Sequence, residues 1–515
     1  MVVAPLRPRF LLAVAVLGLV AFLTFHQRDA LADMGSKYLP TASNPTAATP
    51  ATRPHVVPQL NPHAHRLPSA DSFRAHIEAV TRLPGISMAN AMAGCQWPKD
   101  EYVNFQFAAD EEWVVTPRPD HEIEERRQAW HDFVLGHMIP WADVKDKFSG
   151  RGIVVVAGNH GTVMRLKVVL RRLNFLRSKM PVEVHYWDDE MSQDVLRELR
   201  DVYANIAFND LSNQTTNIVH VKKDGLFINF QLKSAALINS RFAEPFLLDS
   251  DNVPVLDPAT LYDSRVYREF RTVFWPDIAR SWPQNPAWAI TNTPCRMDEY
   301  ELESGQLMVD KRRYWYHLQL AAWLNNEQGA YYNKFLLGDK DMFRYAWHAL
   351  KTPYGRPRKW LTSVGNLNDG FYCGHSFAQH HPDTSQVAFL HGGLTKIASL
   401  EVMRWNRDTR GGYYRHFKRA STDEDPSASV HVQIIFDGAT YKPNHTADFH
   451  VAMCTEMRDV PAGDLEEILP GWEEQFEELG GFWQLEQEER VKAEKERIKA
   501  EIERGDKKGG LPKAD

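Results

Sequence analysis

Short apolar runs that end abruptly in polar residues recur through the middle of the chain. They are three to five residues long, which is typical of strands buried on both faces of a sheet. Longer segments with apolar residues at helical spacing alternate with them, and this alternation predicts an α/β fold with a parallel sheet. Ligands of such sheets bind beyond the carboxyl ends of the strands. Strands are expected at Ile153–Ala157, Val182–Tyr186, Phe246–Leu248 and Val387–Leu390, and helices at 162–176, 192–203 and 230–240.

Two carboxylates follow the strand predicted at Phe246–Leu248, namely Asp249 and Asp251. In an extended backbone, residues i and i+2 point to the same side, so both carboxylates can face one ion. Oxygen ligands of this kind suit a hard divalent cation, which accepts water or phosphate in its other positions. Asp257 and Pro258 then form a helix start and close a strand–loop–helix unit.

The Asp-x-Asp triplet occurs twice more, so it is weak evidence by itself. Asp339 and Asp341 precede a helix predicted at Met342–Leu350, and capping of that helix accounts for at least one of them. The pair Asp423 and Asp425 lies in a polar loop with no strand before it, which favours a solvated charge cluster.

Polar side chains stand at or near the ends of other predicted elements. Asn159 and His160 follow the first strand, although Gly-Asn is also an ordinary turn pair. His391 follows the last strand and Lys396 comes five residues later, so an imidazole and a cation could complete the site; a lone His is otherwise structural. Lys233, on the helix predicted at 230–240, could reach a diphosphate, with a solvated surface lysine as the alternative.

A glycine between polar residues marks a further candidate segment, Glu303-Ser304-Gly305-Gln306. Because glycine has no Cβ, Gly305 permits close approach of the backbone to a ligand. Glu303 and Gln306 are therefore candidate site residues, together with Asp339 and Asp341.

Composition narrows the classes of function. The chain has 515 residues and a net charge of −7, and no block rich in Lys and Arg appears, which argues against nucleic acid as a partner. Four cysteines form no C-x-x-C pair, so a zinc knuckle is disfavoured and up to two disulfides are expected, in any of three connectivities. Asn213 and Asn444 begin N-glycosylation sequons.

The amino end indicates a secretory protein. Arg7 and Arg9 precede an apolar stretch from Phe10 to Phe25, which is somewhat shorter than the roughly 20 residues that span a bilayer. Positive residues before the stretch favour a signal anchor with a cytosolic amino terminus. Cleavage after Ala30-Leu31-Ala32 is the alternative. In both cases the bulk of the chain would lie in the secretory lumen.

Together these residues describe a divalent cation that holds a nucleotide diphosphate. Asp249, Asp251 and His391 are its expected ligands, and Lys396 with Lys233 would contact the phosphates. A cation stabilises the diphosphate as it leaves, so the pattern predicts activation of a nucleotide-activated sugar.

An ordered set of motifs across residues 150–400 resembles a known family, the fungal Golgi α-mannosyltransferases that extend N-glycan mannan. The α-1,2 branch-forming members are the most similar in character. The motifs are the segments 153–159, 181–184, 247–254, 274–277, 303–306, 338–343 and 389–391.

The resemblance implies a type II Golgi membrane protein with a glycosyltransferase-A (Rossmann-like) fold. It also implies manganese (Mn²⁺), GDP-mannose as donor, a mannose-containing glycan or glycoprotein as acceptor, and retention of configuration. A Golgi mannosyltransferase complex is a further expected partner. On this basis Asp249 and Asp251 match the metal-binding pair. The segments 303–306 and 339–341 would lie near the donor sugar and acceptor.

The expected organisation follows the composition along the chain. A cytosolic tail (1–9), an anchor (10–25) and a Pro/Thr/Ala-rich stalk (26–70) precede a helical extension (71–150). The catalytic domain is expected at 151–415, followed by a β-containing extension (416–480) and a charged helical or disordered tail (481–515).

Three alternatives stay open at this point. The linkage formed could be α-1,3 instead of α-1,2. A glycoside hydrolase would need two carboxylates that flank a sugar bond, and Glu303 and Asp339 could supply them. A mannan-binding protein without catalysis would keep its aromatic residues and tolerate the loss of Asp249 and Asp251.

Overall fold

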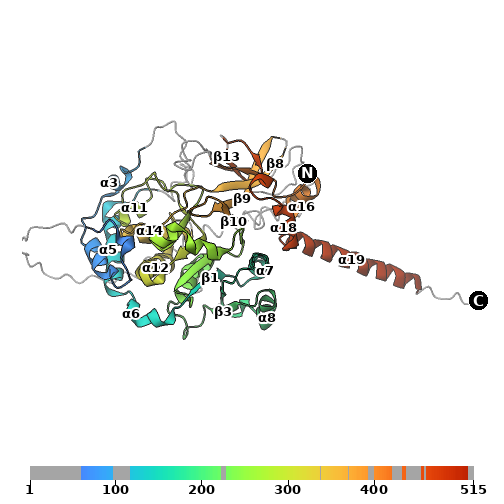
Figure 1. The fold of residues 1–515 in the computed structure, drawn as a ribbon, viewed down its shortest axis with the longest axis horizontal. Coiled ribbons are helices and arrows are strands. Elements are labelled where there is room, and N and C mark those ends of the chain that lie inside the picture. The colour runs from blue at the N-terminus through green and yellow to red at the C-terminus, as the bar shows by residue number, and fades with distance from the viewer. Residues whose placement is uncertain are drawn as a thin grey trace, which may run out of the picture. The chain divides into compact units, whose positions relative to one another are not determined.

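Two β-sheets carry the fold in the computed structural model of the chain (Figure 1). The structure describes residues 60–96, 116–221, 228–336, 338–368, 370–392, 400–419, 432–435, 454–457 and 460–508. The predicted anchor, most of the stalk, Lys396, the Asp423/Asp425 pair and the Asn444 sequon lie outside these ranges. None of the helices within them is both long and apolar enough to cross a membrane.

The first sheet has six strands in the order β3-β2-β1-β4-β7-β6. Strands β1 to β4 are parallel, as the alternation predicted. The expectation of a wholly parallel sheet is wrong, because β7 runs antiparallel to both β4 and β6. The bounds are β1 Arg151–Val156, β2 Val182–Tyr186, β3 Ile206–Asp210, β4 Glu244–Leu248, β6 Thr272–Pro276 and β7 Leu302–Val309.

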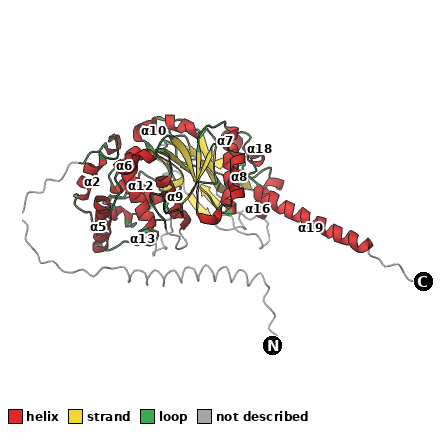
Figure 2. Cartoon of the chain, turned by 90° about the horizontal axis from the view of Figure 1, so that it is seen from below, coloured by secondary structure: helices red, strands yellow, loops and turns green. Residues whose placement is uncertain are grey.

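Both faces of this sheet are buried, which explains why its central strands are continuous apolar runs. In β1, Val154 joins the core on one face, while Ile153 and Val155 join the core on the other. Helices cover both faces in Figure 2. They include α7 His160–Phe175, α8 Gln193–Val202, α9 Ile228–Asn239, α12 Lys311–Asn326 and α14 Lys340–Ala349.

The second sheet is antiparallel and is joined to the first through the short strand β5, Asn252–Pro254. Strand β5 pairs with β10, Val387–His391, and this pairing sets His391 opposite Asn252. The strand predicted at Val387–Leu390 is thus confirmed, but it belongs to the second sheet. The other strands are β8 Thr362–Asn368, β9 Phe371–His380, β11 His416–Lys418, β12 Val432–Ile435, β13 Cys454–Met457 and β14 Gly463–Asp464.

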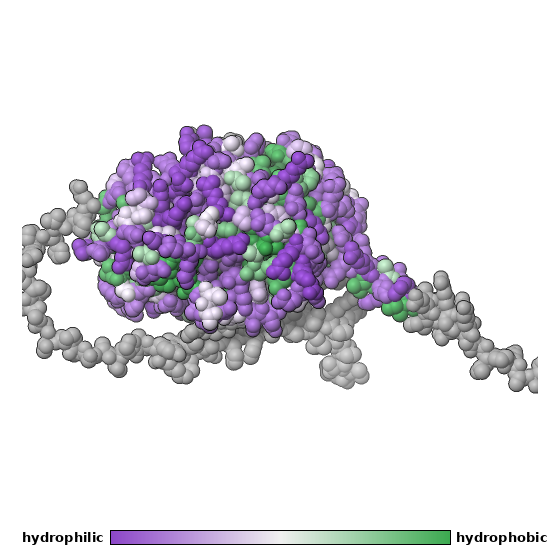
Figure 3. All heavy atoms as spheres, turned by 60° about the horizontal axis from the view of Figure 1, so that its bottom comes forward, coloured by the Kyte–Doolittle hydropathy of each residue, from purple (hydrophilic) through white to green (hydrophobic). Residues whose placement is uncertain are grey.

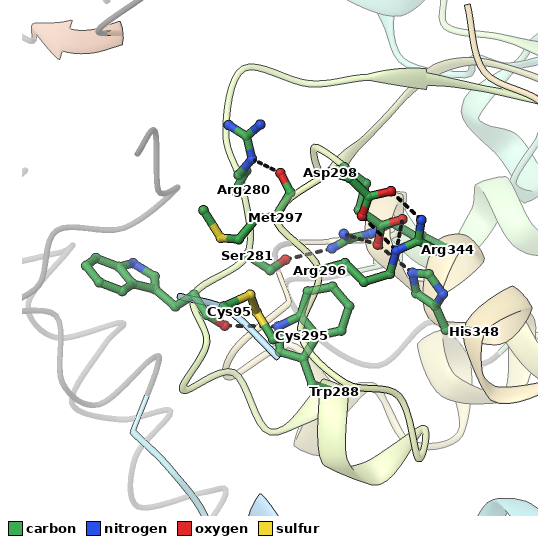
Figure 4. Close-up of a disulfide and its surroundings, with 12 residues drawn as sticks. Cys95, Arg280, Ser281, Trp288, Cys295, Arg296, Met297, Asp298, Arg344 and His348 are labelled. Atoms are coloured by element: carbon green, nitrogen blue, oxygen red, sulfur yellow. Dashed lines mark hydrogen bonds and ion pairs between the residues drawn. A yellow bond between two sulfur atoms is a disulfide. The ribbon is translucent and has the colours of Figure 1, made fainter. Parts of the chain in front are cut away.

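Helices from the amino-terminal part pack against α11, Ala287–Ile290, and against α12. Arg127 donates hydrogen bonds to the carbonyls of Ile86 and Ala289, and a disulfide joins Cys95 to Cys295 across 200 residues (Figure 4). Cys373 is also disulfide-bonded. The helices are α2 Phe73–Thr81, α3 Met88–Met92, α5 Asp120–Gly136 and α6 Trp141–Val144.

The carboxyl-terminal elements are α16 Leu400–Thr409, α18 Trp472–Glu478 and α19 Trp483–Lys508. Glu473 of α18 accepts hydrogen bonds from the backbone N–H groups of Tyr413 and Tyr414, each at 2.7 Å. The charged tail predicted as helical or disordered is helical to Lys508. Shorter helices are α10 Arg265–Phe270 and α13 Gly329–Tyr332, with 3₁₀ turns at 64–66, 145–147, 188–190, 258–263 and 465–467.

Surface side chains on the face drawn in Figure 3 are mostly hydrophilic. The large apolar side chains that are exposed are few and lie on four elements, two of them on α19, which disfavours a broad apolar contact surface on the described residues. They are Leu135, Phe175, Leu367, Val491 and Ile498.

A buried histidine makes the stability of the second sheet depend on pH. His375 donates a hydrogen bond from Nε2 to the backbone carbonyl of Tyr413 at 2.7 Å. Its ring also stacks on the Tyr413 ring, with the two centroids 4.1 Å apart. Desolvation by burial lowers the pKa of His375 to about 3. Its neutral form therefore stabilises the fold above about pH 6.5, and this stability is lost as the pH falls toward 3, because only the unfolded chain takes up the proton.

We expect wild-type protein to lose about 2 kcal/mol of unfolding free energy through His375 between pH 7 and pH 5. His375→Gln keeps an N–H donor but has no group that titrates between pH 5 and pH 7. The variant should therefore not show this pH-dependent loss of unfolding free energy. Urea unfolding at the two pH values measures the difference. The exposed His63→Gln is the control; an equal pH dependence of wild type and His375→Gln would contradict the assignment.

Candidate active site

The candidate site lies where β4 ends and the chain turns into β5. The backbone N–H of Asp249 donates to the Gly305 carbonyl at 2.9 Å, and that of Asn252 donates to the Asp249 carbonyl at 3.1 Å. The N–H of Gly392 donates to the Asp251 carbonyl at 3.0 Å. These bonds fix the Asp-Ser-Asp turn between β7 on one side and the end of β10 on the other.

The structure brings Asp249, Asp251 and His391 together, as the sequence predicted. His391 Nε2 lies 3.5 Å from Asp251 Oδ1 and 4.0 Å from Asp249 Oδ2. One ligand atom from each residue falls within 4.8 Å of the others. Two carboxylates and one imidazole nitrogen form a donor set that fits a divalent cation such as Mn²⁺.

Gly305 gives His391 the room to reach this position. A Cβ at residue 305 would lie 2.6 Å from Cε1 and 2.8 Å from Nδ1 of His391. The glycine thus allows close approach of an imidazole, where the sequence had suggested approach of a ligand. On the same side, Glu303 accepts a hydrogen bond from the Gly305 N–H at 2.7 Å and lies 3.7 Å from His391 Nδ1.

Lys233 reaches the site from α9. Its Nζ lies 2.9 Å from both carboxylate oxygens of Asp249, 3.3 Å from Ser304 Oγ and 3.7 Å from Asp339 Oδ2. Burial disfavours its charge, but the attraction of Asp249 and Asp339 is stronger and raises the pKa of Lys233. The lysine is therefore a permanent cation that offsets part of the negative charge.

The two carboxylates of the Asp339/Asp341 triplet point to different places. Asp339 faces Lys233 and makes no side-chain capping bond to α14, so it belongs to the cluster. Asp341 accepts hydrogen bonds from Arg344 Nε at 2.8 Å and from the N–H of Leu302 at 3.3 Å, so its carboxylate ties α14 to β7.

Burial shifts the acidity of two carboxylates in the cluster. Desolvation raises the pKa of Glu303, and the positive potential of His391 only partly opposes it. Desolvation also raises the pKa of Asp339, against the attraction of Lys233. Both shifts express the cost of gathering acids in one buried place.

Gln306 is buried beneath the turn. Its Oε1 accepts a hydrogen bond from Asn252 Nδ2, which also donates to the Gly305 carbonyl at 2.8 Å. Its Nε2 has no hydrogen-bond partner among the described residues. Gln306 therefore links β7 to the turn and keeps both N–H donors of its side-chain amide.

Asn159 and His160 lie at the start of α7 and make other contacts. Asn159 Oδ1 accepts from the N–H of Thr162 at 3.0 Å, which is the geometry of a helix cap. The His160 ring meets Trp483 edge-on at 5.7 Å, and Trp483 lines a small cavity of about 20 Å³ together with Asp251. Lys396 is outside the described residues.

A second charged layer, which the sequence did not single out, adjoins Glu303. Asp277 and Glu301 both pair with Lys340, the latter at 3.0 Å. Burial and the neighbouring Asp341 carboxylate raise the pKa of Glu301 to about 7. Ser304 was missed as well, although both it and Asp277 lie within quoted motifs. The apolar segments beside Asp277 and Ser304 could have identified them, because a polar residue next to a buried strand is itself expected to be buried.

Gly305→Ala should weaken cation binding, because the added methyl group displaces His391 from Asp249 and Asp251. We expect the dissociation constant for Mn²⁺ to rise about ten-fold or more, as for loss of support to a ligand. Electron paramagnetic resonance of free Mn²⁺ measures the change. Gly136→Ala is a matched control, since a Cβ there meets nothing within 4 Å; unchanged Mn²⁺ affinity of Gly305→Ala would refute the role of this glycine.

Solved structures of glycosyltransferases overlap with part of this chain. The bifunctional glycosyltransferase WbbM matches with a TM-score of 0.32 and 14% identity, over 40% of this chain and 38% of that one. The mannosyltransferase Ktr4p of S. cerevisiae matches with a TM-score of 0.27 and 10% identity, over 53% and 84% of the two chains. These structural overlaps are partial and assign no activity to the chain.

Comparison of sequences is more informative. The family model described as "Mannosyltransferase putative" matches residues 150–299 and 287–381. The α-1,2-mannosyltransferase MNN24 of Candida albicans is 25% identical over 48% of this chain and 41% of its own length. MNN2 of the same organism, also an α-1,2-mannosyltransferase, is 22% identical over 74% and 73%. The α-1,3-mannosyltransferase MNN1 of Saccharomyces cerevisiae is 25% identical over 32% and 24%.

The matched region contains β1 to β9 and therefore both Asp249 and Asp251. The chain spans less than half of the length of the first two relatives, at 41% and 48%. The motifs, the family model and these relatives agree: residues 150–381 of this chain are similar to a mannosyltransferase family model, and the chain is similar to fungal α-mannosyltransferases.

Proposed function

We propose that this protein transfers mannose from GDP-mannose to a mannose hydroxyl of a glycan, forming an α-1,2 linkage with retention of configuration. One observation supports the proposal most: Asp249, Asp251 and His391 converge on one point at the carboxyl end of β4. The choice of mannose as the transferred sugar rests on the similarity of this chain to relatives that are named mannosyltransferases. The mixed sheet with this site at its edge supports a glycosyltransferase-A fold.

Asp249, Asp251 and His391 would hold Mn²⁺ in this proposal. The bound ion supplies positive charge that stabilises the departing diphosphate. Lys233 keeps Asp249 in place and prevents the carboxylates from repelling one another. Glu303 lies against His391 and orients its ring. Asp339, which lies beside Lys233 at the edge of the cluster, would accept a hydrogen bond from a sugar hydroxyl.

The location and partners complete the proposal. The apolar stretch 10–25 would anchor the chain in the Golgi membrane with the catalytic part in the lumen. The acceptor would be a mannose-containing glycan of a glycoprotein or of cell-wall mannan, and the enzyme would act within a mannosyltransferase complex.

An α-1,3 linkage is the second candidate, because a relative with that named activity also matches. The linkage depends on which acceptor hydroxyl faces the anomeric carbon, so only product analysis decides it. The hydrolase alternative would use Glu303 and Asp339, and the binding-protein alternative would need neither carboxylate pair.

Full-length protein in detergent, given Mn²⁺ and α-mannobiose, should form a trisaccharide from GDP-mannose but not from UDP-galactose or UDP-N-acetylglucosamine. EDTA should abolish the reaction. Asp251→Asn should lower kcat/KM at least about 100-fold, since several kcal/mol of charge stabilisation are lost. Mass and linkage analysis of the product measures transfer and distinguishes α-1,2 from α-1,3.

Asp263→Asn removes an exposed carboxylate that pairs with Arg268 on the surface, and it should retain full activity. Release of mannose from mannobiose without a nucleotide sugar would favour the hydrolase. Glycan binding without transfer from any donor, unchanged in the double variant Asp249→Asn/Asp251→Asn, would favour the binding protein.

A further inference from the structure

A cavity of about 400 Å³ lies beside the candidate site and is not used by the proposed transfer. It is bounded by the end of β6, the start of β7 and the loop 353–360. Among the residues that line it are Trp275, Tyr300, Glu301, Tyr354, Arg356 and Trp360. Pockets for small ligands typically measure roughly 300–1,000 Å³, so this cavity is large enough to hold a sugar unit with its hydroxyl groups.

The sheet topology places this cavity at the same edge as the candidate site. Strand β4 ends opposite Gln306, and β7 begins four residues earlier, at Leu302, which pairs with Pro276. The start of β7 therefore extends past the carboxyl end of β4. Glu301 lines the cavity and Glu303 faces His391, and two residues of extended chain span only about 7 Å.

The cavity wall combines aromatic rings with polar groups. Tyr300 lies between Trp360, which stacks on it with the ring centroids 4.7 Å apart, and Arg280, which covers it at 4.1 Å, so both faces of the Tyr300 ring are covered and the ring supports Trp360 in the wall. Trp360 is anchored by a hydrogen bond from its Nε1 to the Asp277 carbonyl at 2.9 Å. Rigid aromatic surface beside hydrogen-bonding groups is suited to the C–H faces and hydroxyl rims of sugars.

Several charges along the wall are already paired, as Figure 4 shows for part of them. Asp298 accepts from Arg296 Nε at 2.9 Å, and Arg344 contacts both Asp341 and Glu299. Glu301 is held by Lys340. Because these charges neutralise one another, the wall favours a neutral polyhydroxyl ligand over a nucleotide diphosphate.

A second cavity of about 440 Å³ adjoins the first and shares Phe270, Tyr354 and Arg356 with it. It is lined by Arg296 and Glu299, which follow Cys295 in the chain. The disulfide to Cys95 therefore holds this segment of the wall (Figure 4). Two adjoining cavities suit a ligand made of several linked units.

We propose that these two cavities form a distal subsite that binds a neutral oligosaccharide, the part of an acceptor glycan remote from the mannose that is extended. The proposal rests on the transferase function for the identity of the ligand. The subsite would select long acceptors over short ones, because it contributes to binding only when the glycan is long enough to reach from the transfer site.

Acceptor length is the variable that tests this subsite. With full-length protein, linear α-mannopentaose should show a KM about ten-fold lower than α-mannobiose, which corresponds to about 1.4 kcal/mol of added binding. Tyr300→Ala should remove most of this advantage and leave the KM and kcat for mannobiose within about two-fold of wild type, because it removes the ring that supports Trp360 in the cavity wall. Arg356→Ala, at an exposed position, should have the same selective effect without threatening the fold.

Direct binding separates this proposal from the transferase. Isothermal titration of Asp251→Asn with mannobiose and mannopentaose, without donor or metal, should keep the preference for the longer glycan. If transfer from GDP-mannose fails while this preference and its loss in Tyr300→Ala persist, the transferase is wrong and the glycan subsite stands. Arg82→Ala, an exposed arginine at the end of α2, is the control.

Three results would overturn the subsite. The first is equal affinity for mannobiose and mannopentaose. The second is an equal loss of affinity for both glycans in Tyr300→Ala and Arg356→Ala. The third is binding of inorganic pyrophosphate that Arg356→Ala abolishes and that no glycan displaces, since it would assign the cavities to an anion.

Discussion

Mutual repulsion of buried carboxylates is the constraint around which this protein is built. Asp249, Asp251, Glu303 and Asp339 all lie in one small region with little access to water. Burial raises the pKa values of Glu303 and Asp339, and a neighbouring carboxylate raises each further, Asp277 for Glu303 and Asp249 for Asp339. Lys233 offsets one charge, and a divalent cation would offset two more. The cluster is thus electrostatically incomplete by itself, and this deficit is the physical reason to infer a cation there.

The pairing of β5 with β10 is what brings the metal-ligand candidates together. Asp251 and His391 are 140 residues apart in the chain, yet His391 pairs with Asn252 in an antiparallel register. A shift of this register by one residue would turn the imidazole to the opposite face of the strand pair. The second sheet therefore positions a ligand for the first sheet, and Gly305 removes the Cβ that would otherwise block the approach.

Those features of the site that depend on local pattern could be predicted from the sequence, and those that depend on pairing across the chain could not. Asp249, Asp251 and His391 follow apolar runs, so each was expected at a strand end. Strand β3 was missed because all five of its residues are only partly buried, so it has no buried apolar run. Strand β7 was missed because Glu303 to Gln306 interrupts it with polar residues and a glycine. The disulfide partner of Cys95 could not be predicted, since spacing does not determine connectivity.

The two Asp-x-Asp triplets within the described residues show that the same motif can place its two carboxylates in different ways. In extended chain, residues two apart point to one side, and Asp249 and Asp251 accordingly converge on His391. In a helix, residues two apart are separated by about 200° around the axis, because each residue advances about 100°. Asp339 and Asp341 open α14, so Asp339 turns toward Lys233 while Asp341 turns toward Arg344. The backbone conformation around the triplet, more than the triplet itself, therefore determines whether both carboxylates can serve one ion.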